Sequence, residues 1–329
     1  MKLKLLIIAA VILILLAISQ LVMNNDDIGG AGSGTDCSQT AERQYKTIAI
    51  VAHDMKHMFM ANVAGMIREK AKENENIKVL LYDSEGSNEK QTAQLKELID
   101  KKVDGIILNP TDKDAINPAI EEVKKAGIPL ITVNMNASSK AVDCYIGSDS
   151  VQAGEFQGNF VAEKLKGKGN LVVLAGIVGQ DTTEDRLKGL QNIVDKYPGM
   201  RIAEVEHGDW ERTKGAEMME KIISNNQKID AVVSQNDEML LGALQVLDRH
   251  GLKPVTVGVD AIPEALEALK EGRISATVYQ NSKAQATGAF EVMSKIFNHE
   301  KVESVKWIPH ELVTPENIDD YIVPNISRN

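Results

Sequence analysis

Polar side chains follow three short apolar runs in the second half of the chain. The runs at residues 231–234 and 255–258 are rich in β-branched residues, which is typical of buried strands. The third run is at residues 276–279. Just beyond the three runs stand Asn236, Asp260 and Gln280. The carboxyl ends of parallel strands open onto the crevice where ligands bind. A carboxylate and two amides that converge there can each form several hydrogen bonds, so the sequence predicts a site for hydroxyl groups.

Residue types that catalyse reactions or hold metals are not arranged here for those tasks. His53 and His57 have the spacing of a two-histidine zinc face, but that face requires a helix, whereas these residues leave a strand in a loop. Asp181, Glu184 and Asp185 open a helix, where acidic side chains commonly stabilise the helix dipole. No nucleophile elbow, Cys–His pair or phosphate-binding loop is present. We therefore predict no enzyme activity, no metal site and no cofactor.

The elements that must position the polar residues alternate between strand and helix. Strands are expected at residues 47–52, 78–82, 105–108 and 129–133, with amphipathic helices such as 61–74 and 114–126 between them. A second set of strands is expected near residues 170–174, 202–206, 231–234 and 255–258. Alternation of this kind predicts an α/β fold with parallel sheets, and its repetition predicts two similar lobes.

The N-terminus predicts the compartment. Two lysines precede an uncharged stretch at residues 5–23 and two aspartates follow it, so the positive-inside rule places the rest of the chain outside the cytoplasm. The stretch is nearly long enough to span a bilayer, and we expect a retained anchor. A small-residue cleavage site at 17–19 leaves a signal peptide at residues 1–23 as the alternative. Residues 24–45, rich in Gly, Ser, Asp and Asn, are expected to form a flexible tether.

Composition narrows the organisation and the partners. The part that follows the tether exceeds what a single hydrophobic core usually supports, so two domains are expected. The net charge of -10 and the absence of a basic stripe interleaved with aromatic residues argue against nucleic acid as a partner. Cys37 and Cys144 are the whole thiol inventory. They form either a disulfide that clips the tether to the first lobe or two free thiols, and the residues before Cys37 do not form a lipidation motif.

An ordered series of motifs resembles the ribose-binding type of periplasmic sugar-binding protein. The motifs are ILNPTD at 107–112, IPLITVN at 128–134, GSD at 147–149, QNDEMLLGA at 235–243, VD at 259–260 and ATVYQ at 276–280. The resemblance implies two doubly wound lobes that are joined by a hinge of three chain crossings and close on a sugar. The crossings are expected near Ser148, Gln280 and Lys306. The implied lobes comprise residues 46–148 with 281–305 and residues 149–280 with 306–329.

The resemblance also implies ligand-binding residues. Phe59 and Trp210 match positions where aromatic rings stack on the apolar faces of a sugar, with burial in the core as the alternative. Asn236, Asp260 and Gln280 match an amide, a carboxylate and a hinge amide that bind hydroxyl groups. Helix capping by Asn236 and turn hydrogen bonding by Asp260 are the alternatives, because both residue types favour these roles.

A further asparagine is assigned by its place in the chain. Asn109 precedes a proline in the loop after a predicted strand and either faces the cleft or stabilises that loop.

Departures from the family pattern concern the identity of the ligand. Asn134 and Met135 stand where the ribose binder has an Asp-Arg pair, and Glu184 stands where it has a cleft arginine. The loss of both guanidinium groups removes two multi-donor clamps, which argues against ribose itself. Lys56 and His57 replace neutral polar loop residues, and both are candidate ligand contacts together with Asn134 and Glu184.

Three classes of function fit these features. The first is an extracytoplasmic solute-binding protein, expected to be a monomer, that delivers a monosaccharide, cyclitol or related polyol to an ABC permease. The second is an anchored sugar sensor that presents the ligand to a histidine kinase or chemoreceptor. The third, a transcription regulator with the same two-lobe fold, would need a helix-turn-helix domain at the N-terminus, where the apolar stretch stands instead. Transport is the leading prediction.

Overall fold

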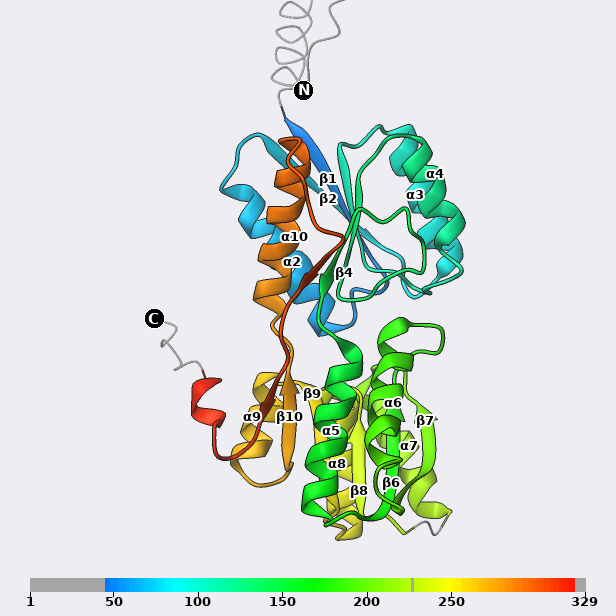
Figure 1. The fold of residues 1–329 in the computed structure, drawn as a ribbon, viewed down its shortest axis with the longest axis vertical. Helices are drawn as coiled ribbons and strands as arrows, with labels where there is room; N and C mark the ends of the chain where they lie inside the picture. The colour runs from blue at the N-terminus through cyan, green and yellow to red at the C-terminus, as the bar shows by residue number, and fades with distance from the viewer. Residues whose placement is uncertain (1–44, 226–227, 323–329) are drawn as a thin grey trace, which may run out of the picture. The chain divides into compact units, whose positions relative to one another are not determined.

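A computed structural model describes residues 45–225 and 228–322 of the 329-residue chain (Figure 1). From Gln44 onward the chain forms one unit of mutual contacts. The predicted anchor, most of the tether and Cys37 lie outside the described residues. Among the described residues, no helix is long and apolar enough to cross a membrane. Cys144 is buried in a strand, and its disulfide with Cys37 remains a hypothesis.

The first lobe is built on a parallel sheet of six strands within the described residues, in the order β11-β5-β4-β3-β1-β2. The strands are β1 (Lys46–Ala52), β2 (Ile77–Asp83), β3 (Gly105–Leu108), β4 (Leu130–Val133), β5 (Cys144–Gly147) and β11 (Val305–Trp307). The helices are α2 (Met58–Lys72), α3 (Asn88–Asp100), α4 (Asn117–Lys125) and α10 (Ser282–Phe297).

The second lobe repeats this plan with the order β12-β10-β9-β8-β6-β7. Its strands are β6 (Lys168–Ala175), β7 (Gly199–His207), β8 (Ala231–Ser234), β9 (Val255–Asp260), β10 (Ala276–Tyr279) and β12 (Glu311–Val313). Its helices are α5 (Ser150–Lys164), α6 (Asp181–Val194), α7 (Arg212–Ser224), α8 (Asp237–His250) and α9 (Pro263–Lys270), with a short 3-10 helix η1 (Ile318–Asp320). Five strands run parallel, whereas the edge strand β12 is antiparallel to β10. The predicted pair of α/β lobes is confirmed.

Alternate side chains along β1 point to opposite faces of the first sheet. Ile48 and Ile50 pack in the core that α2 and α10 cover, whereas Ala49 and Val51 pack in the core under α3 and α4 (Figure 1). Successive strand residues point to opposite faces, and both faces of a parallel sheet are covered by helices. The apolar runs read from the sequence are therefore uninterrupted, and polar residues begin where the strands end.

The chain passes between the lobes at three places. The first passage follows β5 and the second follows β10. The third lies between Trp307 of β11 and Glu311 of β12, so Lys306 and Trp307 belong to the first sheet rather than to the second lobe. His310 joins the three passages: its Nδ1 lies 3.1 Å from the carbonyl oxygen of Asp149, and its Nε2 lies 3.4 Å from Gln280 Oε1.

Candidate functional site

A cavity of about 310 Å³ lies between the carboxyl ends of the two sheets. Its first wall comes from the loop after β1, the start of α2 and the end of β4. Its second wall comes from α6, the loop before α7 and the ends of β8, β9 and β10. The lining residues are His53, Lys56, His57, Met58, Phe59, Met60, Asn134, Met135, Thr182, Arg186, Trp210, Glu211, Arg212, Thr213, Asn236, Glu238, Asp260, Ile262 and Gln280.

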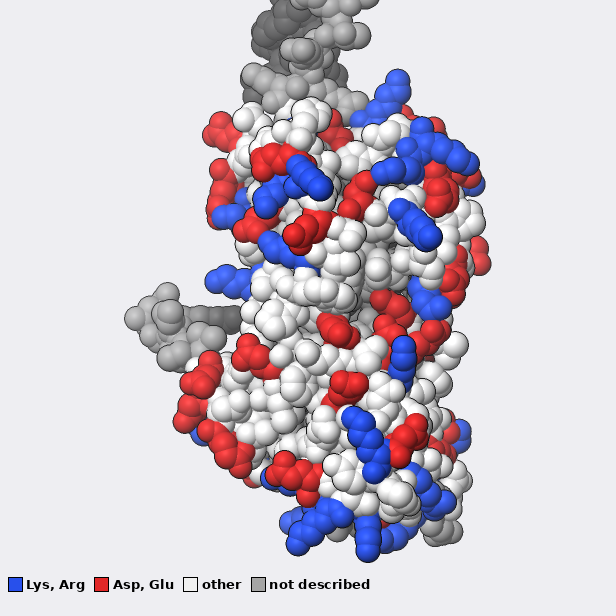
Figure 2. Space-filling view, in the orientation of Figure 1, with Lys and Arg blue, Asp and Glu red and all other residues white. Residues whose placement is uncertain are grey.

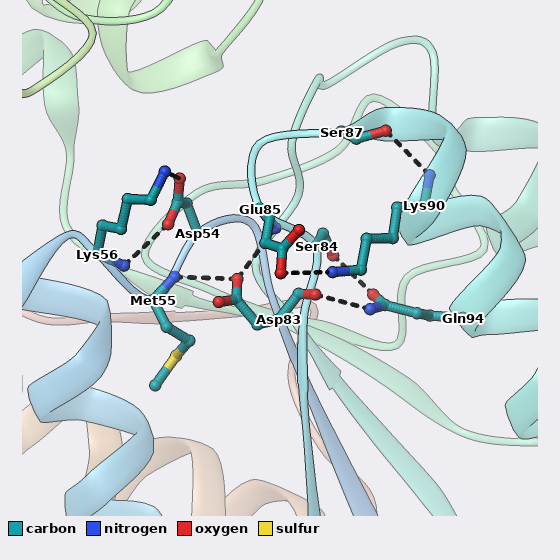
Figure 3. Close-up of polar contacts among 9 residues, drawn as sticks. All are labelled: Asp54, Met55, Lys56, Asp83, Ser84, Glu85, Ser87, Lys90 and Gln94. Atoms are coloured by element: carbon teal, nitrogen blue, oxygen red, sulfur yellow. Dashed lines mark hydrogen bonds and ion pairs between the residues drawn. The ribbon is translucent and has the colours of Figure 1, made fainter.

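Two carboxylates hold the loop that carries the first wall (Figure 3). Asp54 Oδ1 accepts a hydrogen bond from the backbone N–H of Lys56 at 2.8 Å. Asp83, at the end of β2, accepts from the N–H groups of Met55 and Glu85 at 3.1 and 3.0 Å. Asp83 thereby ties the loop after β1 to the turn after β2. This loop and the start of α2 carry three predicted ligand contacts that line the cavity: Lys56, His57 and Phe59.

A stacked pair of histidines forms the base of the first wall. The rings of His53 and His57 are nearly parallel, with centroids 4.9 Å apart. Asn109 donates to the carbonyl of Val133 at 3.1 Å, which turns its Oδ1 toward His53 Nδ1. Burial lowers the pKa of His53 to about 4 and also lowers that of His57. Asn109 is fully buried and does not line the cavity, because its side chain is used to hold His53 and the end of β4.

The predicted amides Asn134 and Gln280 meet across the lobe interface. Gln280 Nε2 donates to Asn134 Oδ1 at 2.9 Å, and both residues line the cavity. Gln280 Oε1 in turn accepts from the guanidinium of Arg186 at 2.6 Å, and Arg186 also donates to the carbonyl of Gln235. The Arg186 guanidinium lies 5.7 Å from the centroid of the Trp210 ring.

Arg186 corrects the inference that the cleft has lost its guanidinium groups. Arg186 is 3% exposed and lines the cavity, and burial lowers its pKa. Glu184, expected in the cleft, lies on α6 with its side chain 55% exposed and 3.4 Å from Lys113 Nζ. Residues two apart on a helix do not share a face, so Glu184 and Arg186 point in different directions. Helical periodicity is the sequence signal for Arg186, because Thr182 and Arg186 lie four residues apart on α6 and both line the cavity.

The predicted carboxylate, Asp260, stands in an uncommon backbone conformation at the end of β9. Its φ is +118° and that of Ala261 is +56°, a region that residues with a side chain rarely adopt. Asp237 holds this turn, because its buried carboxylate accepts from the N–H of Ile262 at 3.1 Å and from the hydroxyl of Thr277 at 2.8 Å. Burial raises the pKa of Asp260 to about 7, against the opposing effect of Arg186.

Asn236 and Trp210 line the cavity and are also bonded to one another. Asn236 caps α8, since its Oδ1 accepts from the N–H of Met239 at 3.0 Å, and its Nδ2 donates to the carbonyl of Trp210 at 3.0 Å. The helix-capping role considered for Asn236 is therefore present in the structure. The Trp210 indole N–H donates to Gln180 Oε1 at 2.7 Å, which fixes the ring at the cavity edge.

Charged side chains of both signs lie on the surface of the two lobes (Figure 2). Lys and Arg are interspersed with Asp and Glu on both lobes of the face drawn in Figure 2, so that face carries no basic stripe for nucleic acid. Within residues 45–225 and 228–322, no group of three or more His, Cys, Asp or Glu side chains could hold a metal ion.

Comparison with known proteins supplies the family. The periplasmic binding protein domain matches residues 48–301. The chain is 32% identical over 278 residues to the ribose import binding protein of Bacillus subtilis, covering 84% of this chain and 90% of that protein. It is also 32% identical to the xylitol-binding protein of Mycolicibacterium smegmatis, covering 88% of this chain and 82% of that protein.

The structural comparison agrees. An ABC transporter solute-binding protein from Bacillus halodurans with bound myo-inositol superposes with a TM-score of 0.82 at 32% identity, covering 86% of this chain and 99% of that one. These three similar proteins are named as binding proteins and not as enzymes. The chain belongs to the periplasmic binding protein family.

Proposed function

We propose that this protein captures a neutral monosaccharide, cyclitol or related polyol in the cavity between its lobes and delivers it to an ABC permease. The charge balance of the cavity carries the proposal. Three basic residues line it, Lys56, Arg186 and Arg212, and three acidic residues oppose them, Glu211, Glu238 and Asp260. A wall without net formal charge suits an uncharged ligand. Its amide, carboxyl and guanidinium groups can each form hydrogen bonds with ligand hydroxyls.

The aromatic residues support the same class of ligand. Trp210 and Phe59 line opposite walls of the cavity. Sugars and cyclitols have apolar C–H faces on which such rings stack, while their hydroxyls bind the polar groups. The similar proteins bind ribose, xylitol and myo-inositol by name, all neutral and rich in hydroxyl groups.

The partner and the compartment are part of the proposal. The similar proteins include an import binding protein and an ABC transporter component, which favours transport over the sensor alternative. We propose that the two lobes lie outside the cytoplasm, in keeping with the family, and that the protein acts as a monomer. The apolar stretch at residues 5–23 is proposed to anchor the protein at the membrane.

Calorimetry on the full-length chain tests the proposal, with a detergent that lacks a sugar headgroup. The panel comprises pentoses, hexoses, inositols, xylitol and amino sugars, with sugar phosphates and uronic acids as charged controls. We expect one neutral member to bind with a dissociation constant of about 1 μM or less, which corresponds to about 8 kcal/mol. If no neutral member binds, or if a charged control binds most tightly, the proposed class of ligand is wrong.

A further inference from the structure

Three consecutive residues of the second lobe contact the first lobe beside the cavity. The carbonyl of Gly179 accepts from the N–H of Lys113 at 3.1 Å. Gln180 Nε2 donates to the carbonyl of Thr111 at 3.4 Å, and Asp181 accepts from the N–H of Asn136 at 2.9 Å. We call residues 179–181 the clasp. Its contacts join the two lobes, so they depend on closure.

Gly179 shows how closely the clasp is fitted to the first lobe. Its φ is +88°, and a Cβ atom built there would lie 2.4 Å from an oxygen of Asp112. Any residue with a side chain would therefore be strained there, and the Asp112 carboxylate would have to move to make room for it.

Gln180 links the clasp to the cavity. It is 1% exposed, and its amide is used at both ends: Nε2 donates to Thr111 in the first lobe and Oε1 accepts from the Trp210 indole. A single buried amide thus bridges the lobe interface and an aromatic ring that lines the cavity.

The Trp210 ring depends on its neighbours for its orientation. Trp210 has a φ of +67° and the preceding Asp209 a φ of +49°, a conformation that persists only when surrounding contacts hold it. The ring lies directly on Gly176, where a Cβ atom would be 2.0 Å from Trp210 Cζ2. Gln180 fixes the polar edge of the same ring.

We propose that Gln180 is a positioning residue that couples lobe closure to the orientation of Trp210. When the lobes separate, Gln180 loses its bond to Thr111, and its amide is then free to change rotamer and release the indole. Closure restores both bonds, so ring orientation and closure stabilise each other. The proposal rests on the proposed function, in which Trp210 stacks on the polyol.

The test uses the full-length chain with Trp307→Phe, which leaves Trp210 as the single tryptophan because the sequence has 2. Trp307 is 59% exposed, so this background preserves the core. Gln180→Glu keeps an acceptor for the indole but removes the donor to Thr111. Gln180→Leu removes both bonds. Glu184→Gln, at the same interface but outside the clasp, is the matched control.

Affinity and dissociation rate are measured with whichever of ribose, xylitol and myo-inositol the parent binds most tightly. We expect both Gln180 variants to raise the dissociation constant about tenfold, mainly through faster dissociation, because a buried hydrogen bond of the closed state is lost. Glu184→Gln should stay within about twofold, as an exposed ion pair contributes little. Gln180→Leu and Trp210→Phe together should cost less than the product of their separate effects.

The indole N–H resonance of Trp210 provides a readout that needs no ligand. We expect its protection from solvent exchange to fall in Gln180→Glu, which loses the bond to Thr111, and to fall further in Gln180→Leu, which loses both bonds, at unchanged overall fold. Unchanged indole protection in Gln180→Leu, affinities within twofold of the parent, or multiplicative effects in the double variant would each overturn the proposal. If the parent binds none of the three polyols, the proposed function fails, whereas the indole resonance still decides the role of Gln180.

Discussion

The two walls of the cavity are built differently. The first wall comes mostly from one segment, residues 53–60, and includes Met58, which is 55% exposed, and Lys56, whose side chain is 76% exposed. The second wall gathers residues from five separate segments, and its central groups are already bonded, as in the contact of Arg186 with Gln280. Prearranged polar groups lose little freedom when a ligand binds. We infer that the second lobe selects the hydroxyl pattern and the first lobe covers the ligand.

The largest effect is expected from Arg186→Met in the second wall. The variant leaves the acceptors of Gln280 and Gln235 without their donor and removes the cation that opposes Asp260. We expect a loss of about 3 kcal/mol or more in binding, which is at least about a hundredfold in affinity. Arg212→Met is the control, since the Arg212 side chain is 35% exposed and paired with Glu238 and Glu264. Equal losses in the two variants, measured by calorimetry, would contradict the special role of Arg186.

The base of the first wall should respond to pH. The folded-state pKa of His53 is about 4, below its ordinary 6.5, so its contribution to stability is present above pH 6.5 and is lost as the pH falls through about 4. The difference in unfolding free energy between the wild type and His53→Gln should therefore shrink by up to about 3 kcal/mol over this range. Denaturant titrations at several pH values measure it. Parallel pH profiles would show that His53 is not held neutral.

Asp260→Asn tests the carboxylate of the second wall. The loss of a carboxyl acceptor for a ligand hydroxyl in a closed site is expected to cost about 2 kcal/mol of binding, while the folded structure is retained. Calorimetry and thermal unfolding of the one variant separate two roles. Unchanged affinity with a lower melting temperature would assign Asp260 to its turn alone.

Phe59→Ala and Met58→Ala compare neighbours in the first wall. Phe59 is partly buried and packs against the core, whereas Met58 is exposed. Loss of the ring should weaken polyol binding by about 1 kcal/mol, and loss of Met58 should change it less. If the thermal stability of Phe59→Ala falls while the polyol affinity is unchanged, the ring belongs to the core and not to the site.

The smallest effect is expected from Glu184→Gln at the rim. Its ion pair with Lys113 is exposed, so its removal should change stability or binding by less than about 1 kcal/mol. A loss as large as that of Asp260→Asn would return Glu184 to the binding site.

Sequence patterns were sufficient for the elements and for many of the residues that line the cavity. The ends of β8, β9 and β10 are marked by Asn236, Asp260 and Gln280, because polar residues appear where a strand leaves the core. Asn109 carries the same signal after β3 but turns inward to His53. The end of a strand therefore predicts the position of a polar residue, but not the group to which its side chain forms a hydrogen bond.

The sequence by itself determined two α/β lobes and the edge of each sheet at which polar groups gather, because strand and helix periodicities are local properties of the chain. Tertiary structure decided which groups meet. Arg186 rather than Glu184 enters the cavity because of the way α6 packs, and Gln280 reaches Asn134 across 146 residues of sequence. The link from Trp210 through Gln180 to Thr111 likewise joins three distant segments. Such contacts depend on how the lobes close, which no local periodicity encodes.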